Sequence, residues 1–347
     1  MVQQLRSRRR GHLPVSSDTA SVVGVPASPL SPIDVVSQTA TRTRNRMRCS
    51  SFEQIARFNN FDYLRLFLAI EVVVGHFWAG MLHPVPLAMP IPPVAAFVGL
   101  SGFLIPQSLD RSRTLRQFAR KRVLRTIPAL IPMLLAITVI WGPAGARGAI
   151  TQYLTAGYHG VFRGVTLPLW SLIVEDALYL VAALLFLANV HRRWKVPAAT
   201  LAALLVIDAV VSDEVTRYRL LSTSIAFFAG MLVASFYDVL RRRSWAWPAL
   251  GATAAVSHRL VFLGSAEAPF LIACVLVVAI TLPQVRWKPP DLSYGIYIWH
   301  APIMLALLEG GMTRGAVWLS AAAAATIGMA AASWYLVEKP ALRLENR

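Results

Sequence analysis

Long apolar segments recur along this chain at a length that suits membrane-crossing helices. From residue 61 onward, hydrophobic runs close to the roughly 20 residues needed to span a bilayer alternate with short polar or basic segments. The pattern predicts an all-α fold, a polytopic membrane helix bundle of about ten transmembrane helices. The expected spans are 61–82, 91–109, 125–143, 168–190, 196–211, 218–240, 245–263, 268–283, 292–309 and 315–337.

Composition agrees with this pattern. The chain is 56% hydrophobic with a mean hydropathy of +0.54, which is too apolar for an ordinary soluble domain. Its two cysteines, Cys49 in a polar segment and Cys274 in an apolar run, offer neither a disulfide framework nor a Cys/His metal cluster. We therefore expect no bound metal and no redox chemistry.

The positions of the basic residues predict the orientation. With a cytoplasmic N-terminus, 27 Lys and Arg fall in inside segments and 6 in outside loops. Such an excess is the positive-inside signal of a multi-pass protein of the inner (plasma) membrane with both termini in the cytoplasm. The net charge of +17 is thus explained by topology, with the lipid bilayer as partner and no nucleic acid required.

The seventh span, 245–263, is the weakest. It is short of apolar residues and is interrupted by His258 and Arg259. If this segment did not cross, Arg286, Lys288 and the basic C-terminus would lie outside, against the charge rule. An even number of spans keeps these basic residues inside, which favours ten spans over nine.

The chain divides into two parts. Residues 1–60 are rich in Ser, Thr, Pro and Arg, without an apolar run long enough for a signal peptide, and predict a disordered basic cytoplasmic tail. One hypothesis is that translation starts at Met47, directly before the first span. Residues 61–343 form the predicted membrane domain.

Arg65 and His76 are the most informative pair of residues. Eleven positions apart in a helix, they return to within about 20° and so share one face, about 16 Å apart along the axis. Alone, Arg65 could snorkel to lipid phosphate and His76 could be a packing residue. Together they indicate a site, and at this depth a neutral imidazole is expected, with a lone pair able to act as general base.

A dense basic segment precedes the third span. Arg120, Lys121, Arg122 and Arg125 cluster there, and guanidinium forks suit phosphate groups. Topology anchoring or binding of anionic lipid is the alternative, which charge alone leaves open.

The fourth span carries a polar stripe. Ser171, Glu175 and Tyr179 recur every four residues, and Asp176 adjoins them. Two adjacent carboxylates in a span are costly, which favours a functional role for one of them. Glu71, in the first span, lies off the shared face and is left unassigned.

The ninth span repeats this arrangement. Ser293 and Tyr297 are four residues apart and His300 follows three residues later. Whether this polar face contacts substrate or another helix is open at this stage.

Six motifs in order carry a family resemblance. FDYLRLFLAIEVVVGHF, FVGLSGFL, RKRVLRTIP, LPLWSLIVEDALYL, LSYGIYIWHAPI and VEKPALR extend from about residue 58 to 343, and through them the chain resembles the acyltransferase-3 family of integral membrane O-acyltransferases. The resemblance implies a ten-helix enzyme that transfers an acyl group, usually acetyl from cytoplasmic acetyl-CoA, to a hydroxyl of a sugar or other acceptor. It also implies that His76 is essential to catalysis and that Arg65, Arg122 and Arg125 contribute.

The chain departs from that family in two places. Glu71 stands where the family is normally apolar, and the seventh span is short. The chain also resembles the stand-alone form, without the extracytoplasmic hydrolase-like domain of some relatives. The membrane domain or a partner protein is then expected to complete the transfer.

These residues suggest a mechanism with acyl-CoA as co-substrate. Arg122 and Arg125 would hold the donor phosphates, and the pantetheine arm would lie along the face from Arg65 to His76. His76 would remove the proton of the acceptor hydroxyl, and Glu175 would orient the imidazole or bind the acceptor. Substrate-binding candidates are Ser171, Tyr297 and His300. A covalent acyl-histidine remains the competing route.

The acceptor is not readable from the residues. Polysaccharide repeat units, lipid-linked sugars and macrolide antibiotics are all compatible, and the acyl chain could be longer than acetyl. A transporter of a sugar or lipid-linked substrate is the alternative function, although no repeated halves with broken helices are visible. A scaffold without activity is a third hypothesis.

Overall fold

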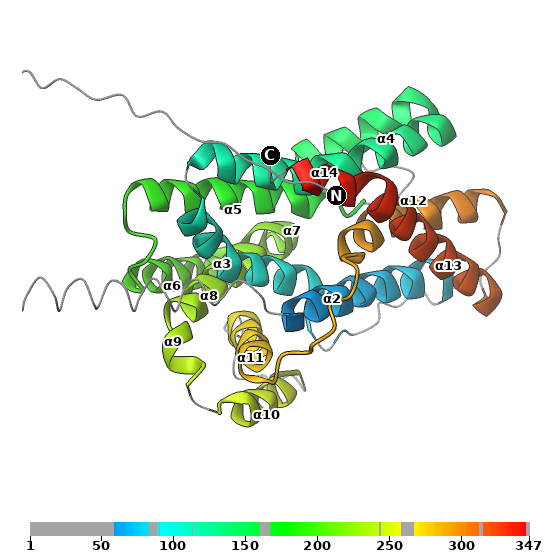
Figure 1. The fold of residues 1–347 in the computed structure, drawn as a ribbon. Coiled ribbons are helices and arrows are strands. Elements are labelled where there is room, and N and C mark those ends of the chain that lie inside the picture. The colour runs from blue at the N-terminus through cyan, green and yellow to red at the C-terminus, as the bar shows by residue number, and fades with distance from the viewer. Residues whose placement is uncertain are drawn as a thin grey trace, which may run out of the picture. The chain divides into compact units, whose positions relative to one another are not determined.

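The computed structural model of the protein describes residues 59–82, 89, 91–112, 114–159, 167–242, 244–257, 267–311 and 315–344. Every regular element in these ranges is helical, which confirms the all-α prediction (Figure 1). The predicted tail, apart from Asn59 and Asn60, and the hypothesis of a start at Met47 lie outside the described residues. The longer helices are α2 (Asn59–Phe77), α3 (Pro93–Arg111), α4 (Leu115–Leu154), α5 (Trp170–Leu187), α6 (Lys195–Val210), α8 (Ser222–Ser235), α10 (Ala246–Ser257), α11 (Glu267–Thr281), α12 (Ser293–Glu309) and α13 (Ala316–Ser333).

Shorter elements extend several of these helices. π-helical turns cover Trp78–Leu82 after α2, Arg217–Leu221 before α8 and Trp334–Glu338 after α13. The remaining pieces are α7 (Glu214–Thr216), α9 (Tyr237–Leu240) and α14 (Lys339–Arg343). Each predicted span therefore contains one of the ten longer helices.

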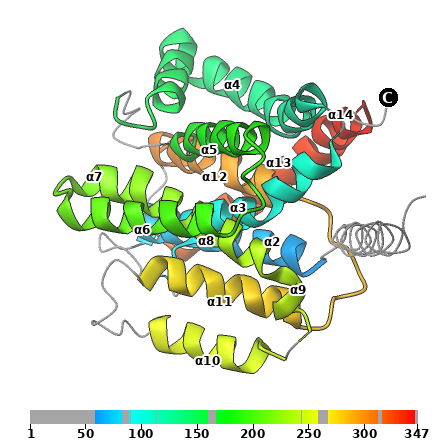
Figure 2. The same ribbon diagram turned by 90° about the vertical axis from the view of Figure 1, so that its left-hand side faces the viewer.

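Five helical stretches in the described ranges are long and apolar enough to cross a membrane. They are Asn59–Leu82, Leu115–Leu154, Trp170–Leu187, Glu214–Ser235 and Ala316–Arg343. These support a multi-pass membrane protein, while ten crossings remain a prediction. The described part of the seventh span, α10 beside α11 (Figure 2), would be only about 18 Å long against a core of about 30 Å. His258 and Arg259 lie outside the described residues.

The basic segment before the third span is helical. α4 begins at Leu115, where the Thr114 side chain accepts a hydrogen bond from the Gln117 backbone N–H. A helix start is favoured there because the cap satisfies an otherwise unpaired donor. Arg122 and Arg125, three residues apart, therefore lie on one helical face.

α4 is also longer than predicted. It continues to Leu154 through a kink at Gly142, whose φ of 70° and ψ of −176° are not helical. Glycine adopts this positive φ without a steric penalty, and Pro143 then restarts the helix. Arg147, expected in an outer loop, is helical.

Glycines bring α3 and α8 into close contact. A Cβ atom on Gly102 would meet the backbone of Phe227, and one on Gly230 would meet the carbonyl of Gly99. Gly99 and Gly102 thus permit the close approach of these two helices. This packing places Ser101, between the two glycines, on the wall of the site described below.

Polar contacts join segments that the charge pattern assigns to the same side. At the predicted cytoplasmic side the contacts include Asn59 Nδ2 to the Val285 carbonyl (2.6 Å), Asp110 to His191 (3.0 Å), Arg120 to the Leu344 carbonyl (2.8 Å) and Arg125 to Asp291 (2.7 Å). At the predicted outer side Trp141 bonds Glu309 and Tyr158 bonds Thr216, both at 2.6 Å. This pairing is the arrangement expected of alternating spans.

Apolar side chains cover much of the outer surface of the bundle. Val139 on α4 is 85% exposed and Val317 on α13 is 76% exposed, whereas Met133 and Ile298 between α4 and α12 are fully buried. A helix with apolar residues on both its inner and outer faces is typical of a protein surrounded by lipid. Apolar residues therefore occur both in the core between the helices and on the outer surface of the bundle.

Candidate active site

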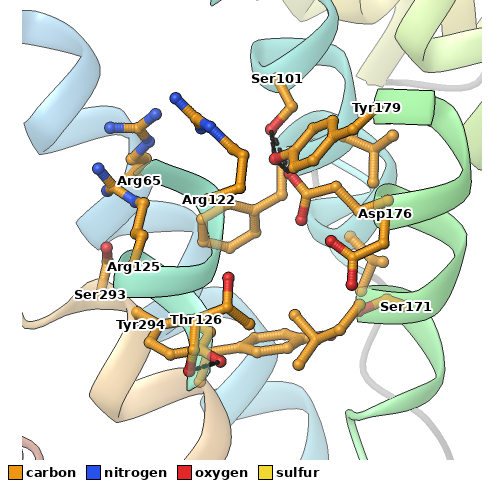
Figure 3. A pocket seen from close by; sticks show the side chains of 16 residues that line it. Arg65, Ser101, Arg122, Arg125, Thr126, Ser171, Asp176, Tyr179, Ser293 and Tyr294 are labelled. Atoms are coloured by element: carbon orange, nitrogen blue, oxygen red, sulfur yellow. Dashed lines mark hydrogen bonds between the residues drawn. The ribbon is translucent and has the colours of Figure 1, made fainter. Parts of the chain in front are cut away.

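A polar cavity of about 100 Å³ lies among α2, α3, α4, α5 and α12. Figure 3 shows the guanidinium groups of Arg65, Arg122 and Arg125 on one side, facing Ser101, Tyr179, Asp176 and Ser171 across the cavity. Thr126, Ser293 and Tyr294 complete its polar wall. The donor-binding arginines predicted from two distant segments are thus brought together.

Arg122 is held in place by aromatic rings. Its Cζ atom lies 5.5 Å from the Phe118 ring centroid and 5.6 Å from that of Tyr179. Nη2 donates to Ser108 Oγ at 3.2 Å, whereas the buried Nε has no hydrogen-bond partner among the described residues. A guanidinium held on rings in this way is pre-organised to bind an anion.

Arg125 is paired with a carboxylate that sequence reasoning missed. Its Nη2 lies 2.7 Å from Asp291 Oδ2, in the segment before α12. Burial opposes ionisation of Asp291, but the charges of Arg125 and Arg65 outweigh it and hold its pKa below the ordinary 3.8. Only the other N–H groups of Arg125 are then available to a ligand. The one sequence signal was the acidic residue directly before LSYG.

The polar stripe of α5 faces the cavity as predicted. Glu175 accepts hydrogen bonds from the hydroxyls of Ser101 and Tyr179. Neighbouring Asp176 accepts one from the Tyr153 hydroxyl at 2.8 Å. Glu175 thus bonds groups in the cavity wall, and the hydrogen-bond partner of His76 is a different residue.

His76 forms a pair with His300. The two rings stack with centroids 4.9 Å apart, and His76 Nδ1 lies 2.9 Å from His300 Nε2. His300 Nδ1 lies 2.7 Å from the backbone carbonyl of Tyr297. Sequence reasoning placed His300 among the substrate-binding residues, and its spacing from Tyr297 carried no sign of this partner 224 residues away.

The contacts of the pair assign both tautomers. A carbonyl only accepts, so His300 Nδ1 carries hydrogen, and neutral His300 accepts at Nε2 from the Nδ1–H of His76. The neutral form is favoured because His300 is 0% exposed. His76 Nε2 is then left with a lone pair, as a general base requires.

His76 and Arg65 open into different spaces. The regular turns of α2 keep the two residues aligned, yet Arg65 lines the cavity and His76 lines a second hollow of about 370 Å³. Val94 and Tyr297 line both spaces and so form the partition between them. The Tyr297 hydroxyl lies 2.7 Å from Ser171 Oγ and donates to the Pro168 carbonyl at 3.1 Å.

Glu71 remains unassigned by its contacts. It is buried, and neither carboxylate oxygen has a hydrogen-bond partner among the described residues.

A helical bundle with membrane-length apolar helices and an internal polar site is the architecture of a multi-pass membrane enzyme. The family described as an acyltransferase domain, acyltransferase-3, matches residues 58–338, and the chain belongs to this family. The protein is therefore an acyltransferase, one that transfers groups other than aminoacyl groups.

Two curated relatives resemble it over most of their length. "Nodulation protein 10" of Rhizobium leguminosarum bv. viciae is 28% identical over 83% of this chain and 94% of its own. "O-acetyl transferase" of Shigella phage Sf6 is 23% identical over 81% of this chain and 95% of its own. No solved structure matches.

Proposed function

We propose that this protein transfers an acyl group, acetyl in the first instance, from cytoplasmic acyl-CoA to a hydroxyl of a carbohydrate or related acceptor. The observation that carries the proposal is a cavity with three arginines next to a hollow that contains an accessible imidazole of defined tautomer. The printed name of one relative, "O-acetyl transferase", supports an oxygen acceptor and an acetyl group. Ten crossings of the inner (plasma) membrane with both termini inside belong to the same proposal.

The donor enters by the arginine cavity. Arg65, Arg122 and Arg125 bind the donor phosphates at its mouth, because fixed guanidinium forks match phosphate oxygens. Glu175 holds Ser101 and Tyr179 in the wall along which the pantetheine arm lies. The cavity of about 100 Å³ admits only a slender arm, so the Tyr297 partition must shift for the thioester to reach His76.

His76 then acts as general base. Its Nε2 takes the proton of the acceptor hydroxyl while the oxygen attacks the thioester carbon, the C–S bond breaks, and the proton passes to the departing thiolate. His300 accepts from His76 Nδ1–H throughout and so stabilises the imidazolium that forms. General-base catalysis of this kind contributes roughly 10²- to 10⁴-fold. Attack by Nε2 itself, through an acyl-histidine, is the competing route.

Turnover by the purified protein tests the proposal. Membrane vesicles or detergent-purified protein would receive labelled acetyl-CoA and a glycan extract of the host cells. His76→Gln is expected to lower label transfer to hydroxyl groups at least about 100-fold. His159→Gln, an exposed histidine outside both spaces, is the matched control.

The result that would sink the proposal is parent-like turnover by His76→Gln. The transporter alternative gains support instead if no hydroxyl-linked label forms while an unmodified solute crosses the vesicles.

A further inference from the structure

We propose that the hollow next to His76 is the acceptor site and that it recognises an uncharged, hydroxyl-rich ring such as a sugar. The inference rests on the proposed acyl transfer and adds the location and the recognition chemistry of the acceptor. Its wall comes from the start of α5, from α7 and from the π-helical turn Arg217–Leu221, of which α7 and the turn lie outside the six motifs.

Two aromatic residues form one wall. Trp170 and Tyr218 have ring centroids 5.7 Å apart at an interplanar angle of 45°. Trp170 is buried behind Tyr218, whereas Tyr218 is 58% exposed and lines the hollow. Aromatic faces of this kind accommodate the apolar face of a ring ligand, and their hydrogen-bonding edges suit its polar rim.

Glu214 and Arg219 supply opposite charges to the same hollow. Arg219 is held by Trp170 and Tyr158, with its Cζ 5.6 and 5.8 Å from their ring centroids, and by a 3.1 Å bond to the Ala156 carbonyl. The Glu214 carboxylate only accepts hydrogen bonds and the Arg219 guanidinium only donates them. Hydroxyl groups both donate and accept, so they can bond to both side chains. Because the two charges offset each other, the hollow does not favour an anion such as a phosphate, and an apolar chain would lie against both charged groups.

The π-helical turn explains why both residues reach the hollow. Tyr218 and Arg219 are adjacent in the chain, yet both line it, while Arg217 turns away and pairs with Asp208 at 3.3 Å. π-helical turns inside helices are frequent at functional sites because they redirect side chains. The π-helical turn thus places two adjacent side chains, Tyr218 and Arg219, at the same hollow.

His76 and Tyr297 complete the hollow at its inner end. A hydroxyl of the bound ring reaches Nε2 of His76 from this side, while the thioester arrives past Tyr297 from the arginine cavity. Donor and acceptor therefore use separate entrances and meet at the histidine. The volume of about 370 Å³ lies at the lower end of ligand pockets, which span roughly 300–1,000 Å³.

The test separates acceptor binding from donor binding. Initial rates would be measured with labelled acetyl-CoA while the glycan extract of the host cells is varied, and then with acetyl-CoA varied. Glu214→Gln and Tyr218→Ala are expected to raise the half-saturating extract concentration roughly five- to thirty-fold, from the loss of one charged hydrogen bond or one aromatic contact. The KM for acetyl-CoA is expected to stay within about twofold, since neither residue lines the donor cavity.

Matched variants control for unspecific effects. Glu267→Gln removes a carboxylate at the start of α11, and Tyr335→Ala removes a tyrosine that is 54% exposed; neither lines either space. Both are expected to match the parent, and thermal unfolding checks that all variants are folded.

Two results would overturn the acceptor site. Either Glu214→Gln and Tyr218→Ala match their controls while His76→Gln is inactive, or they raise the KM for acetyl-CoA instead. If His76→Gln itself keeps parent activity, the underlying function fails, and the two failures are thereby distinguished.

Discussion

Replacement of His300 tests the tautomer assignment on which catalysis depends. His300→Phe keeps a ring of similar size against His76 and against Phe77, whose ring lies 6.3 Å away, but removes both nitrogens. His76 Nδ1–H then loses its acceptor in a part of the fold where His300 is fully buried.

The magnitude follows from that lost hydrogen bond. The His76 side chain is accessible from the hollow and its ring also bonds the Val72 carbonyl, so the loss is that of one net hydrogen bond, about 0.5–1.5 kcal/mol. If the imidazole moves or takes the other tautomer as a result, the population of the productive base falls by the same free energy. At about 1.4 kcal/mol per factor of ten, kcat is expected to fall roughly 2- to 12-fold.

The companion variant supplies the rescue. The Gln side-chain oxygen reaches the position of Nε2, so His300→Gln can accept from His76 and is expected to recover to within about twofold of the parent kcat. Both variants would be assayed for label transfer from acetyl-CoA, with KM measured beside kcat and with thermal unfolding as the check on folding.

The assignment is refuted in either of two ways. His300→Phe could turn over as fast as the parent, which would mean that His300 does not position His76. Alternatively His300→Gln, while folded, could be as slow as His300→Phe, which would mean that the acceptor at Nε2 is not what matters.

Three further predictions concern the donor cavity and the packing. Arg122→Lys is expected to raise the KM for acetyl-CoA about tenfold by loss of the planar fork, and an equal change in acceptor saturation would contradict its donor role. Gly102→Ala should destabilise the fold by roughly 1–3 kcal/mol in thermal unfolding, whereas Gly251→Ala, where a Cβ meets nothing within 4 Å, should not. Asp291 has a lowered pKa in the fold, so its pairing with Arg125 stabilises the protein above the ordinary pKa of 3.8 and is lost as pH falls through the lowered value. Asp291→Asn should therefore unfold at a lower temperature than the parent at pH 7, and the difference should shrink in acid; a constant difference would contradict this.

Local patterns predicted the helices and part of the site. The period of α5 placed Ser171, Glu175 and Tyr179 on one stripe, and all three line the cavity. This succeeded because side chains four residues apart in a helix share a face whatever packs against them. The close approach of α3 and α8 has an equally local cause, since only residues without a Cβ allow it.

Prediction failed where the partner lies far along the chain. Three features were missed because they depend on how α2, α4 and α12 pack. These are the ion pair of Asp291 with Arg125, the hydrogen bond between His300 and His76, and the partition by Tyr297 between Arg65 and His76. The role expected of Glu175 in orienting the imidazole met the same difficulty, because Glu175 bonds Ser101 and Tyr179.

Sequence alone thus determined the helical class and the residue types available for acyl transfer, since these follow from composition and from the period of a single helix. The orientation drawn from the basic residues stays a prediction. Tertiary structure decided which of those side chains meet. Packing of helices more than 200 residues apart joined His76 to His300 and divided the interior into an arginine cavity and a hollow with aromatic and charged walls. The physical reason is that helical period orders side chains around one axis, whereas a site lined by several helices requires several axes to be placed relative to one another.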